Sequence, residues 1–393
     1  MILEEHGQDR ETVVDGLNSL LEGDVTYFSG HPIASMSTIP HRLGIDVYLK
    51  TMERNAGRLH TLKGSERVEQ EVIEMIADLL HLKIPYGTTT SGGTESNILA
   101  MLAMREAKKE VRKPEIIAPK TVHSSIDKAA WILGINLIKT GVDKQFKAIS
   151  RSIEKKISEK TIGIIATAGT TYLGQIDPID EIGGIAAEHR FPLHIDAAFG
   201  GFVIPFLNDL GLGDYSFDFE VNSVTSISVD PHKMGLAPIP AGCLIFRLSR
   251  YLKAITKKIP YLPGASSTQS SILGTRPAAS ILATWAIMKH LGRSGYRKIV
   301  RGCMTQTHLG RERVEDNPLL ELAIEPVMNI LAIQSKKVPL ETVIMKMEER
   351  GWRMASSPLP RSLRLVVMPH VTTGAMNAFF NDLNEFSTTI PSD

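Results

Sequence analysis

The chain contains 393 residues, too many for one small hydrophobic core, so we expect one large and one smaller domain. It has 44 lysine and arginine residues against 43 aspartate and glutamate residues, which gives a formal charge of +1. With 43% hydrophobic and 22% charged residues, the composition is typical of a water-soluble globular protein. The even charge balance, without a basic stripe or a polybasic cluster, excludes an electrostatic nucleic-acid surface and a membrane-surface patch.

Cysteine content and the first residues bear on the compartment. Cys243 and Cys303 have no spacing typical of a metal site, so we expect no metal, and two cysteines fit a reducing environment. The N-terminal residues are acidic and lack an apolar signal core. No apolar run reaches the roughly 18 residues of a membrane span. The sequence therefore predicts a cytoplasmic protein.

The N-terminal residues 1–60 predict a helix followed by an arm. Apolar residues recur at helical spacing over residues 10–22, which predicts a short amphipathic helix. Residues 27–41 are rich in Gly, Pro, Ser and Thr and predict an irregular arm. A second helix is expected at residues 45–52, and Ser65 is placed to cap a third helix that ends near His81.

Residues 61–285 alternate short apolar runs with helical segments and predict the large domain. Helices are expected at residues 94–112, 145–158 and 178–190. The expected strands are residues 86–91, 115–118, 136–140, 162–167, 192–195, 223–229 and 242–247. Seven strands with intervening helices predict an α/β fold, with a mostly parallel sheet covered by helices on both faces.

The remaining residues predict a loop, a long helix and a second domain. Residues 249–276 are rich in Pro, Gly, Ser and Thr and predict a loop that carries Tyr261. A long helix is expected from about residue 277 to 313, interrupted before Gly295. Residues 286–393 predict a small C-terminal α+β domain. Its expected strands are residues 320–325, 329–335 and 363–368, and its expected helices are residues 339–350 and 373–386.

The first motif with chemical meaning is the turn from Thr88 to Asn97, which joins a strand to a helix. Gly92 and Gly93 allow a tight turn, and the free N–H groups of the helix start favour a phosphate, with the Thr94 hydroxyl beside them. Alone, the stretch fits a plain capped turn equally well. It lacks the lysine of a Walker loop and the glycine spacing of a dinucleotide fingerprint.

Two further motifs follow later strands. The strand that ends at Asp196 leads into Ala198 and other small residues that leave room for a flat ligand, and the carboxylate can pair with a protonated ring nitrogen. Asp230-Pro231 ends another strand and places His232 and Lys233 on the turn beyond it, where a lysine can form a Schiff base with an aldehyde. In isolation, Asp196 also fits a helix cap, and Lys233 fits a solvated surface residue.

Two more strand ends carry polar residues. His123 follows one strand and can stack on an aromatic cofactor, although a lone histidine also fits a packing or capping role. Ala168-Gly-Thr-Thr171 follows another strand. Because the carboxyl ends of parallel strands share one edge, we expect these motifs to meet at one ligand site.

These residues together resemble the pyridoxal-phosphate enzymes of fold type I, specifically the group II amino-acid decarboxylases. Ser91-Gly-Gly-Thr-Glu-Ser-Asn97, His194-Ile-Asp-Ala-Ala-Phe-Gly-Gly201 and Ser228-Val-Asp-Pro-His-Lys-Met-Gly235 are most similar to the archaeal L-tyrosine/L-aspartate decarboxylase branch. The similarity covers roughly residues 30–390. It implies a pyridoxal 5'-phosphate cofactor and the decarboxylation of L-tyrosine to tyramine (methanofuran biosynthesis) or of L-aspartate to β-alanine (coenzyme A biosynthesis).

The resemblance also implies roles for single residues. Lys233 would carry the cofactor, Asp196 would pair with its ring nitrogen, and His123 would stack on the ring. Tyr261 would protonate the substrate Cα and Arg364 would bind the substrate carboxylate, although an aromatic anchor and a structural salt bridge are the alternatives. A homodimer is implied as well. The residues implied beside the cofactor's phosphate and ring are Gly93, Thr94, Ala198, Ser228 and His232.

Other functions share part of this pattern. Within enzymes, the alternatives are an L-glutamate decarboxylase and a carbon–carbon lyase of the sphingosine-phosphate type. The sequence contains no apolar anchor, which argues against a lipid lyase. A different class would be an inactive pyridoxal-phosphate-binding regulator, and the intact Lys233 and Asp196 argue against it. The motifs leave the side chain of the substrate open.

Overall fold

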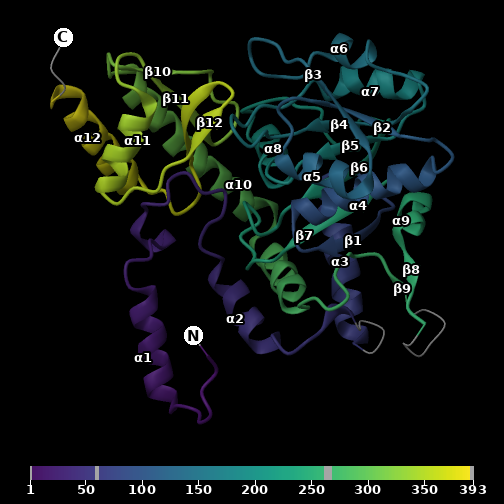
Figure 1. Ribbon diagram of the computed structural model, residues 1–393, viewed down its shortest axis with the longest axis horizontal. Coiled ribbons are helices and arrows are strands. Elements are labelled where there is room, and N and C mark those ends of the chain that lie inside the picture. Colours follow the sequence, from purple (N-terminus) through teal and green to yellow (C-terminus); the bar gives the residue numbers. More distant parts are fainter. Residues whose placement is uncertain (1, 58–61, 261–267, 390–393) are drawn as a thin grey trace.

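The computed structural model describes residues 2–57, 62–260 and 268–389. A large domain built on a seven-stranded sheet lies beside a small domain built on a four-stranded sheet (Figure 1). Helix α10 (Ala279–Glu315) runs from the first domain to the second, with a break at Gly292. The predicted boundary between residues 285 and 286 therefore falls inside a helix that both domains share.

The large sheet has the strand order β1-β7-β6-β5-β4-β2-β3. Strand β7 runs antiparallel to both of its neighbours, so the carboxyl ends of the other six strands lie along one edge. This mostly parallel arrangement confirms the predicted fold class. The strands are β1 (Tyr86–Thr90), β2 (Glu115–Pro119), β3 (Asn136–Thr140), β4 (Thr161–Thr167), β5 (Leu193–Asp196), β6 (Val224–Val229) and β7 (Gly242–Phe246).

Helices cover both faces of this sheet because successive strand residues point to opposite sides. Ile164 belongs to the core on one face and its neighbour Ile165 to the core on the other. The first face carries α10, α3 (Lys63–Leu79), α7 (Ile179–Glu188) and α8 (Ile204–Asp209), with α6 (Ser150–Glu154) beside α7. The second face carries α4 (Gly93–Ala107), α5 (Ser124–Leu133) and α9 (Ser249–Ile255).

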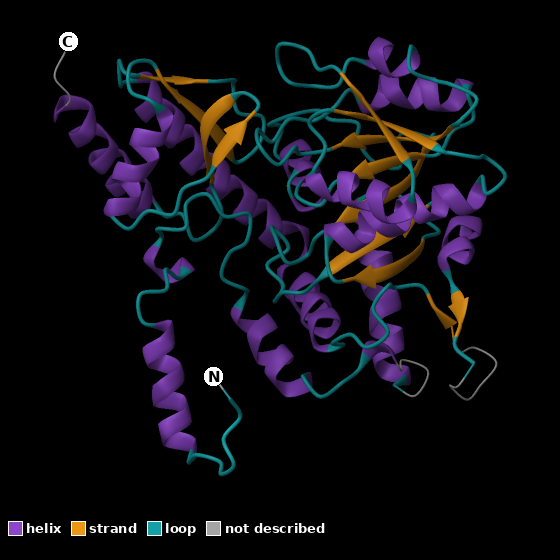
Figure 2. Cartoon of the chain, viewed as in Figure 1, coloured by secondary structure: helices purple, strands orange, loops and turns teal. Residues whose placement is uncertain are grey.

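The small domain has its own apolar core around Trp352, Phe379 and Phe380. Its antiparallel sheet has the order β10-β11-β13-β12. Figure 2 shows this sheet beside the C-terminal helices. The elements are β10 (Leu320–Leu322), β11 (Ile330–Ser335), α11 (Leu340–Glu349), β12 (Ser356–Pro358), β13 (Arg361–Val366) and α12 (Thr373–Thr389).

The N-terminal segment lies outside the sheet layers. Helix α1 (Arg10–Leu21) extends away from the rest of the chain and has no buried residue (Figure 1). The 3-10 helix η1 (Tyr27–Ser29) forms the start of the arm, and α2 (Arg42–Thr51) packs against α10. The remaining short elements are η3 (Gly200–Phe202), β8 (Lys257–Lys258) and β9 (Thr268–Gln269). Within the described ranges, no helix combines the length and apolar content needed to cross a membrane.

Several predicted boundaries were wrong, each for a local reason. Helix α3 begins at Lys63 after the cap position Leu62, so Ser65 lies buried inside the first turn and does not cap it. The helix expected at residues 145–158 is confined to α6, because Asp143 Oδ1 accepts the N–H groups of Gln145 and Lys147 in a turn. Likewise, the loop expected at residues 249–276 begins with helix α9.

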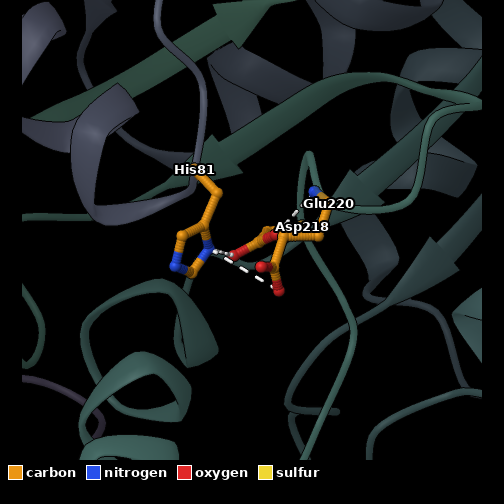
Figure 3. Close-up of side chains that lie close together, drawn as sticks. All are labelled: His81, Asp218 and Glu220. Atoms are coloured by element: carbon orange, nitrogen blue, oxygen red, sulfur yellow. Dashed lines mark hydrogen bonds and ion pairs between the residues drawn. The ribbon is translucent and has the colours of Figure 1, made fainter.

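A polar cluster joins the end of α3 to the loop before β6, so it precedes strands β1 and β6, whereas the predicted site follows their carboxyl ends (Figure 3). His81 has a φ of 57° just after α3, and its Nδ1 lies 2.8 Å from Asp218 Oδ2 and 3.9 Å from Glu220 Oε2. Asp218 is buried, and burial raises the pKa of its carboxyl. Because Asp218 Oδ1 also accepts the N–H of Glu220, the cluster holds the end of the helix to the loop.

Candidate active site

A cavity of about 280 Å³ opens at the carboxyl edge of the large sheet. Ends of β1, β2, β4, β5 and β6 contribute to its wall, as the order of motifs predicts. Seven of the ten predicted site residues line it: Gly93, Thr94, His123, Asp196, Ala198, His232 and Lys233.

Lys233 lies on the turn after β6, where Asp230-Pro231 ends the strand. Its Nζ lies 3.3 Å from Asp230 Oδ2, and its side chain is 20% exposed through the cavity. His232 Nδ1 accepts the N–H of Ala241, so its Nε2 carries the proton and lies 3.6 Å from the same Asp230 oxygen. Burial lowers the pKa of His232, and the imidazole is neutral at pH 7. The turn thus presents one amine, one carboxylate and one neutral imidazole.

The glycine turn at the start of α4 packs against the turn that carries Asp230 and His232. Gly92 occupies the cap position with a φ of 147°, a conformation that favours glycine. Glu95 Oε2 accepts the N–H of Ser91 at 2.7 Å, which fixes the turn. A Cβ on Gly93 would lie 2.9 Å from Ala198 Cβ and 3.1 Å from Asp230 Oδ2. The missing side chain therefore leaves a cradle at a helix N-terminus, where an anion is favoured.

Asp196 ends β5 and forms the floor of the cavity. The side chain accepts N–H groups from Asn97 Nδ2 at 2.9 Å and from Ala198 at 3.1 Å. Ser228 Oγ lies 3.3 Å from Asp196 Oδ1. Two N–H donors therefore hold this buried carboxylate in a fixed orientation at the cavity wall. Asp196 does not cap a helix, because η3 follows the cap position Phe199, and the contact with the Ala198 N–H lies within the turn.

His123 follows β2 and caps α5. Its Nδ1 accepts the N–H of Ser125 at 3.1 Å and lies 2.9 Å from the Ser125 hydroxyl. Burial lowers the pKa of His123 below its ordinary value of 6.5, against the opposing effect of Asp196. The capping role left open by the sequence is confirmed, while the ring also lines the cavity.

Two of the other predicted residues, Ser228 and Arg364, do not line the cavity. Ser228 is fully buried behind Asp196, and its hydroxyl lies 3.0 Å from Asn97 Oδ1. Arg364 lies on β13, where it donates to the carbonyl oxygens of Thr171 at 3.0 Å and Ala34 at 2.8 Å. Thr171 lines the cavity, so the guanidinium stands directly behind its wall. Tyr261 lies outside the described residues.

Three residues at or beside the site were not predicted from the sequence to have a functional role. Asp230 is a strand terminator there, yet it contacts Lys233. Asn97 and His194 hydrogen-bond to each other, with Asn97 Oδ1 and His194 Nε2 2.9 Å apart. The available signals were a histidine inside an otherwise apolar strand and an asparagine in the second turn of a helix that follows a glycine pair. Both mark buried polar groups that need partners.

The donor set fits an aromatic aldehyde that carries a phosphate. Lys233 offers an amine, Asp196 a carboxylate for a ring N–H, and the Gly93 cradle an anion site. Two buried oxygens of the cavity wall, Thr167 Oγ1 and Asp230 Oδ1, have no hydrogen-bond partner within the described part of the chain. The cavity therefore has polar positions that a ligand can satisfy.

Comparisons with known proteins agree with this chemistry. A family model described as "Pyridoxal-dependent decarboxylase conserved domain" matches residues 64–336. An L-aspartate/L-glutamate decarboxylase of Pyrococcus horikoshii is 44% identical over 379 residues, which cover 96% of this chain and 98% of that protein. A probable L-tyrosine/L-aspartate decarboxylase of Methanothermobacter thermautotrophicus is 42% identical over 359 residues, covering 91% of this chain and 98% of the relative.

Solved structures share the whole architecture. A glutamate decarboxylase of Lactobacillus brevis superposes with a TM-score of 0.91 at 21% identity, covering 100% of this chain and 95% of that chain. A sphingosine-1-phosphate lyase of Burkholderia pseudomallei gives a TM-score of 0.90 at 26% identity, covering 99% and 92%. The fold is therefore common to enzymes with different substrates, and the site must identify the reaction.

Proposed function

This chain belongs to the pyridoxal-dependent decarboxylase family, and from that premise we propose that it removes the α-carboxylate of L-aspartate as CO₂ and so forms β-alanine. Family membership establishes an amino-acid decarboxylase that uses pyridoxal phosphate. The substrate is our proposal, because both curated relatives described above carry aspartate in their names, whereas tyrosine and glutamate each occur in one. The observation that carries the function is that Lys233, Asp196 and the Gly93 cradle meet in one cavity.

We assign the covalent anchor to Lys233, whose Nζ points into the cavity beside Asp230. Asp230 holds the amine by an ion pair, which places it for reaction with an aldehyde. Gly93, Thr94 and His232 are assigned to the phosphate side, where the start of α4 supplies N–H groups. The small side chain of Ala198, which lines the cavity, leaves room for a flat ring.

When bound, pyridoxal phosphate supplies an electron sink for the electron pair that CO₂ loss leaves on the substrate Cα. Asp196 supports that role because an ionised carboxylate facing the ring nitrogen keeps it protonated. His123 would lie against the ring face and hold its plane. Such positioning lets the chain orient the bond to be broken, and orientation of this kind is worth several kcal/mol.

Arg364 is our candidate for recognition of a substrate carboxylate. Its Nε is buried without a hydrogen-bond partner in the described residues, and two backbone carbonyls fix the rest of the guanidinium. Burial lowers the pKa of Arg364 from its ordinary value, yet the group stays charged at pH 7. We keep Tyr261 as the proposed proton donor to Cα, although it lies outside the described residues.

We further propose a homodimer located in the cytoplasm. Helix α1 exposes Val13, Leu17 and Leu20 to 53%, 53% and 79%, an apolar row that a second copy of the chain would cover. Cys243 and Cys303 are free and buried, which fits a reducing compartment. Light scattering after size exclusion tests the dimer, and Leu17→Glu combined with Leu20→Glu is expected to shift the mass toward the monomer. A variant with the same mass as wild type would show that α1 does not form the dimer interface.

The substrate is tested by measuring CO₂ release from purified holoenzyme with L-aspartate, L-glutamate, L-tyrosine and L-lysine at equal concentrations. L-aspartate is expected to give the highest kcat/KM, and Lys233→Ala is expected to abolish release. Lys139→Ala, an exposed lysine paired with Asp127, is the matched control and should retain full activity. Faster turnover of L-tyrosine or L-glutamate would reject the proposed substrate, and release by Lys233→Ala at the wild-type rate would reject the mechanism.

A further inference from the structure

A buried hydrogen-bond network at the cavity wall centres on Asn97, which itself lines the cavity. The side-chain nitrogen of Asn97 donates to Asp196 Oδ2 at 2.9 Å and to Ser125 Oγ at 2.9 Å. Its oxygen Oδ1 accepts from Ser228 Oγ at 3.0 Å and from His194 Nε2 at 2.9 Å. An amide has two hydrogens and two lone pairs, so all four positions of Asn97 are used.

The orientation of this amide follows from the chemistry of its partners. A carboxylate oxygen only accepts, so the atom of Asn97 that faces Asp196 must be the nitrogen. Oδ1 then faces His194, which must donate from Nε2. His194 Nδ1 lies 2.9 Å from Ser226 Oγ and accepts its hydroxyl hydrogen. Burial lowers the pKa of His194 to about 4, which agrees with a neutral ring carrying a single proton.

The same amide also supports the hydrogen bonds that orient His123. Ser125 Oγ accepts one hydrogen from Asn97, so its own hydrogen is free to go to His123 Nδ1, 2.9 Å away. The N–H of Ser125 points to the same Nδ1 at 3.1 Å. Two donors leave Nδ1 without a hydrogen, and the proton of the neutral ring must sit on Nε2. His123 therefore offers a donor, and not an acceptor, at its free nitrogen.

We propose that Asn97 is a positioning residue for the decarboxylation, because its one amide holds the Asp196 carboxylate in place and, through the Ser125 hydroxyl, supports the Nε2–H tautomer of His123. This inference rests on the proposed roles of Asp196 and His123 toward the cofactor. Asn97 touches neither substrate nor reacting atoms through these contacts. Its effect passes through the two side chains that it orients.

Loss of the amide has a definite consequence. Asn97→Ala removes a hydrogen bond to a buried carboxylate, so Asp196 is held less firmly toward the ring nitrogen and supports the positive charge on the cofactor ring less well. The nitrogen of Lys233 in its bond to the cofactor then holds a proton more tightly. The pH midpoint of the cofactor's visible absorption should rise by about one unit, and cofactor affinity should fall about tenfold.

The experiment compares wild type, Asn97→Ala, Ser125→Ala and Asn317→Ala by spectroscopic pH titration and by cofactor affinity. Asn317 is a buried asparagine of the small domain whose side chain bonds Asn384 and the Leu319 N–H, so it reproduces the structural loss without touching the site. Asp230, His232 and Arg364, the other charged or titratable groups around the cavity, are unchanged in all four proteins. Only Asn97→Ala should move the midpoint, while Ser125→Ala should lower kcat with the midpoint unmoved.

The outcomes separate this inference from the proposed function. If wild type binds cofactor on Lys233 and Asn97→Ala keeps the wild-type midpoint and affinity, the positioning role is refuted and the function stands. An equal shift in Asn317→Ala would also refute it, since general loosening would then be the cause. If wild type binds no cofactor in the same affinity measurement, the proposed function itself is refuted.

Discussion

The buried carboxylate of Asp177 makes a pH-dependent contribution to stability that its structure predicts in sign and size. Asp177 Oδ1 accepts the N–H of Ala148, and Oδ2 accepts the N–H of Thr167, each at 2.8 Å. Burial raises the pKa of Asp177 from 3.8 to about 6, against the opposing effect of these hydrogen bonds. Thr167 lines the cavity, so this carboxylate holds one end of the active-site wall.

A carboxyl whose pKa is raised on folding stabilises the fold most below its unfolded pKa, and that stabilisation is lost as the pH rises through the folded pKa. The shift of about two units corresponds to about 3 kcal/mol above pH 7, of which about 1 kcal/mol falls between pH 5 and pH 7. Asp177→Asn keeps the shape and cannot titrate. The free energy of unfolding of wild type, relative to this variant, should therefore fall by about 1 kcal/mol from pH 5 to pH 7.

Urea unfolding at pH 5, 6 and 7 measures the free energy of unfolding of both proteins. Tryptophan fluorescence and circular dichroism are recorded together, because coincident transitions by the two signals show that unfolding is two-state. Asp180→Asn, an exposed neighbour in the first turn of α7, is the matched control and should run parallel to wild type. The reasoning would be refuted if the two proteins kept a constant difference in the free energy of unfolding, or if wild type gained stability relative to Asp177→Asn as the pH rises.

Three further changes probe the site and the fold. Gly93→Ala adds a Cβ 2.9 Å from Ala198 Cβ, so cofactor affinity in a spectroscopic titration should fall about tenfold, and unaltered affinity would reject the anion cradle. Arg364→Lys loses the contact to either Thr171 or Ala34, and the KM for L-aspartate should rise about tenfold, whereas an unchanged KM would leave Arg364 a structural residue. His81→Ala removes the hydrogen bond to Asp218 and should lower the free energy of unfolding by about 1 kcal/mol without changing kcat, and a lower kcat would contradict a purely structural cluster.

The strands of the large sheet could be predicted closely because their signals are local. Short runs rich in apolar or β-branched residues mark β1 to β7, and the structure moves each of their ends by at most one residue. Helix ends were harder to place. The turn around Asp143 replaces most of one predicted helix through side-chain contacts to nearby N–H groups, and such competition is not visible in helical periodicity.

The candidate site also has a part that the sequence predicts and a part that it does not. Lys233 and Asp196 follow strands, so topology alone brings them to one edge. The contact of Asn97 with Asp196 joins residues 99 positions apart, and only the folded chain reveals it. Asp230 contacts Lys233 within one turn, but its strand-ending role beside Pro231 concealed the second function. Sequence therefore predicts which groups reach the edge, and packing decides which of them pair.

The central claim is that Lys233 carries the cofactor of a decarboxylase, and reductive trapping tests it most directly. Holoenzyme is treated with borohydride, which fixes an imine as a stable amine, and the modified peptide is then mapped by mass spectrometry. The modification is expected on Lys233 alone, and prior incubation with L-aspartate should reduce its yield while CO₂ is released. Modification of another lysine, or none despite bound cofactor, would contradict the account.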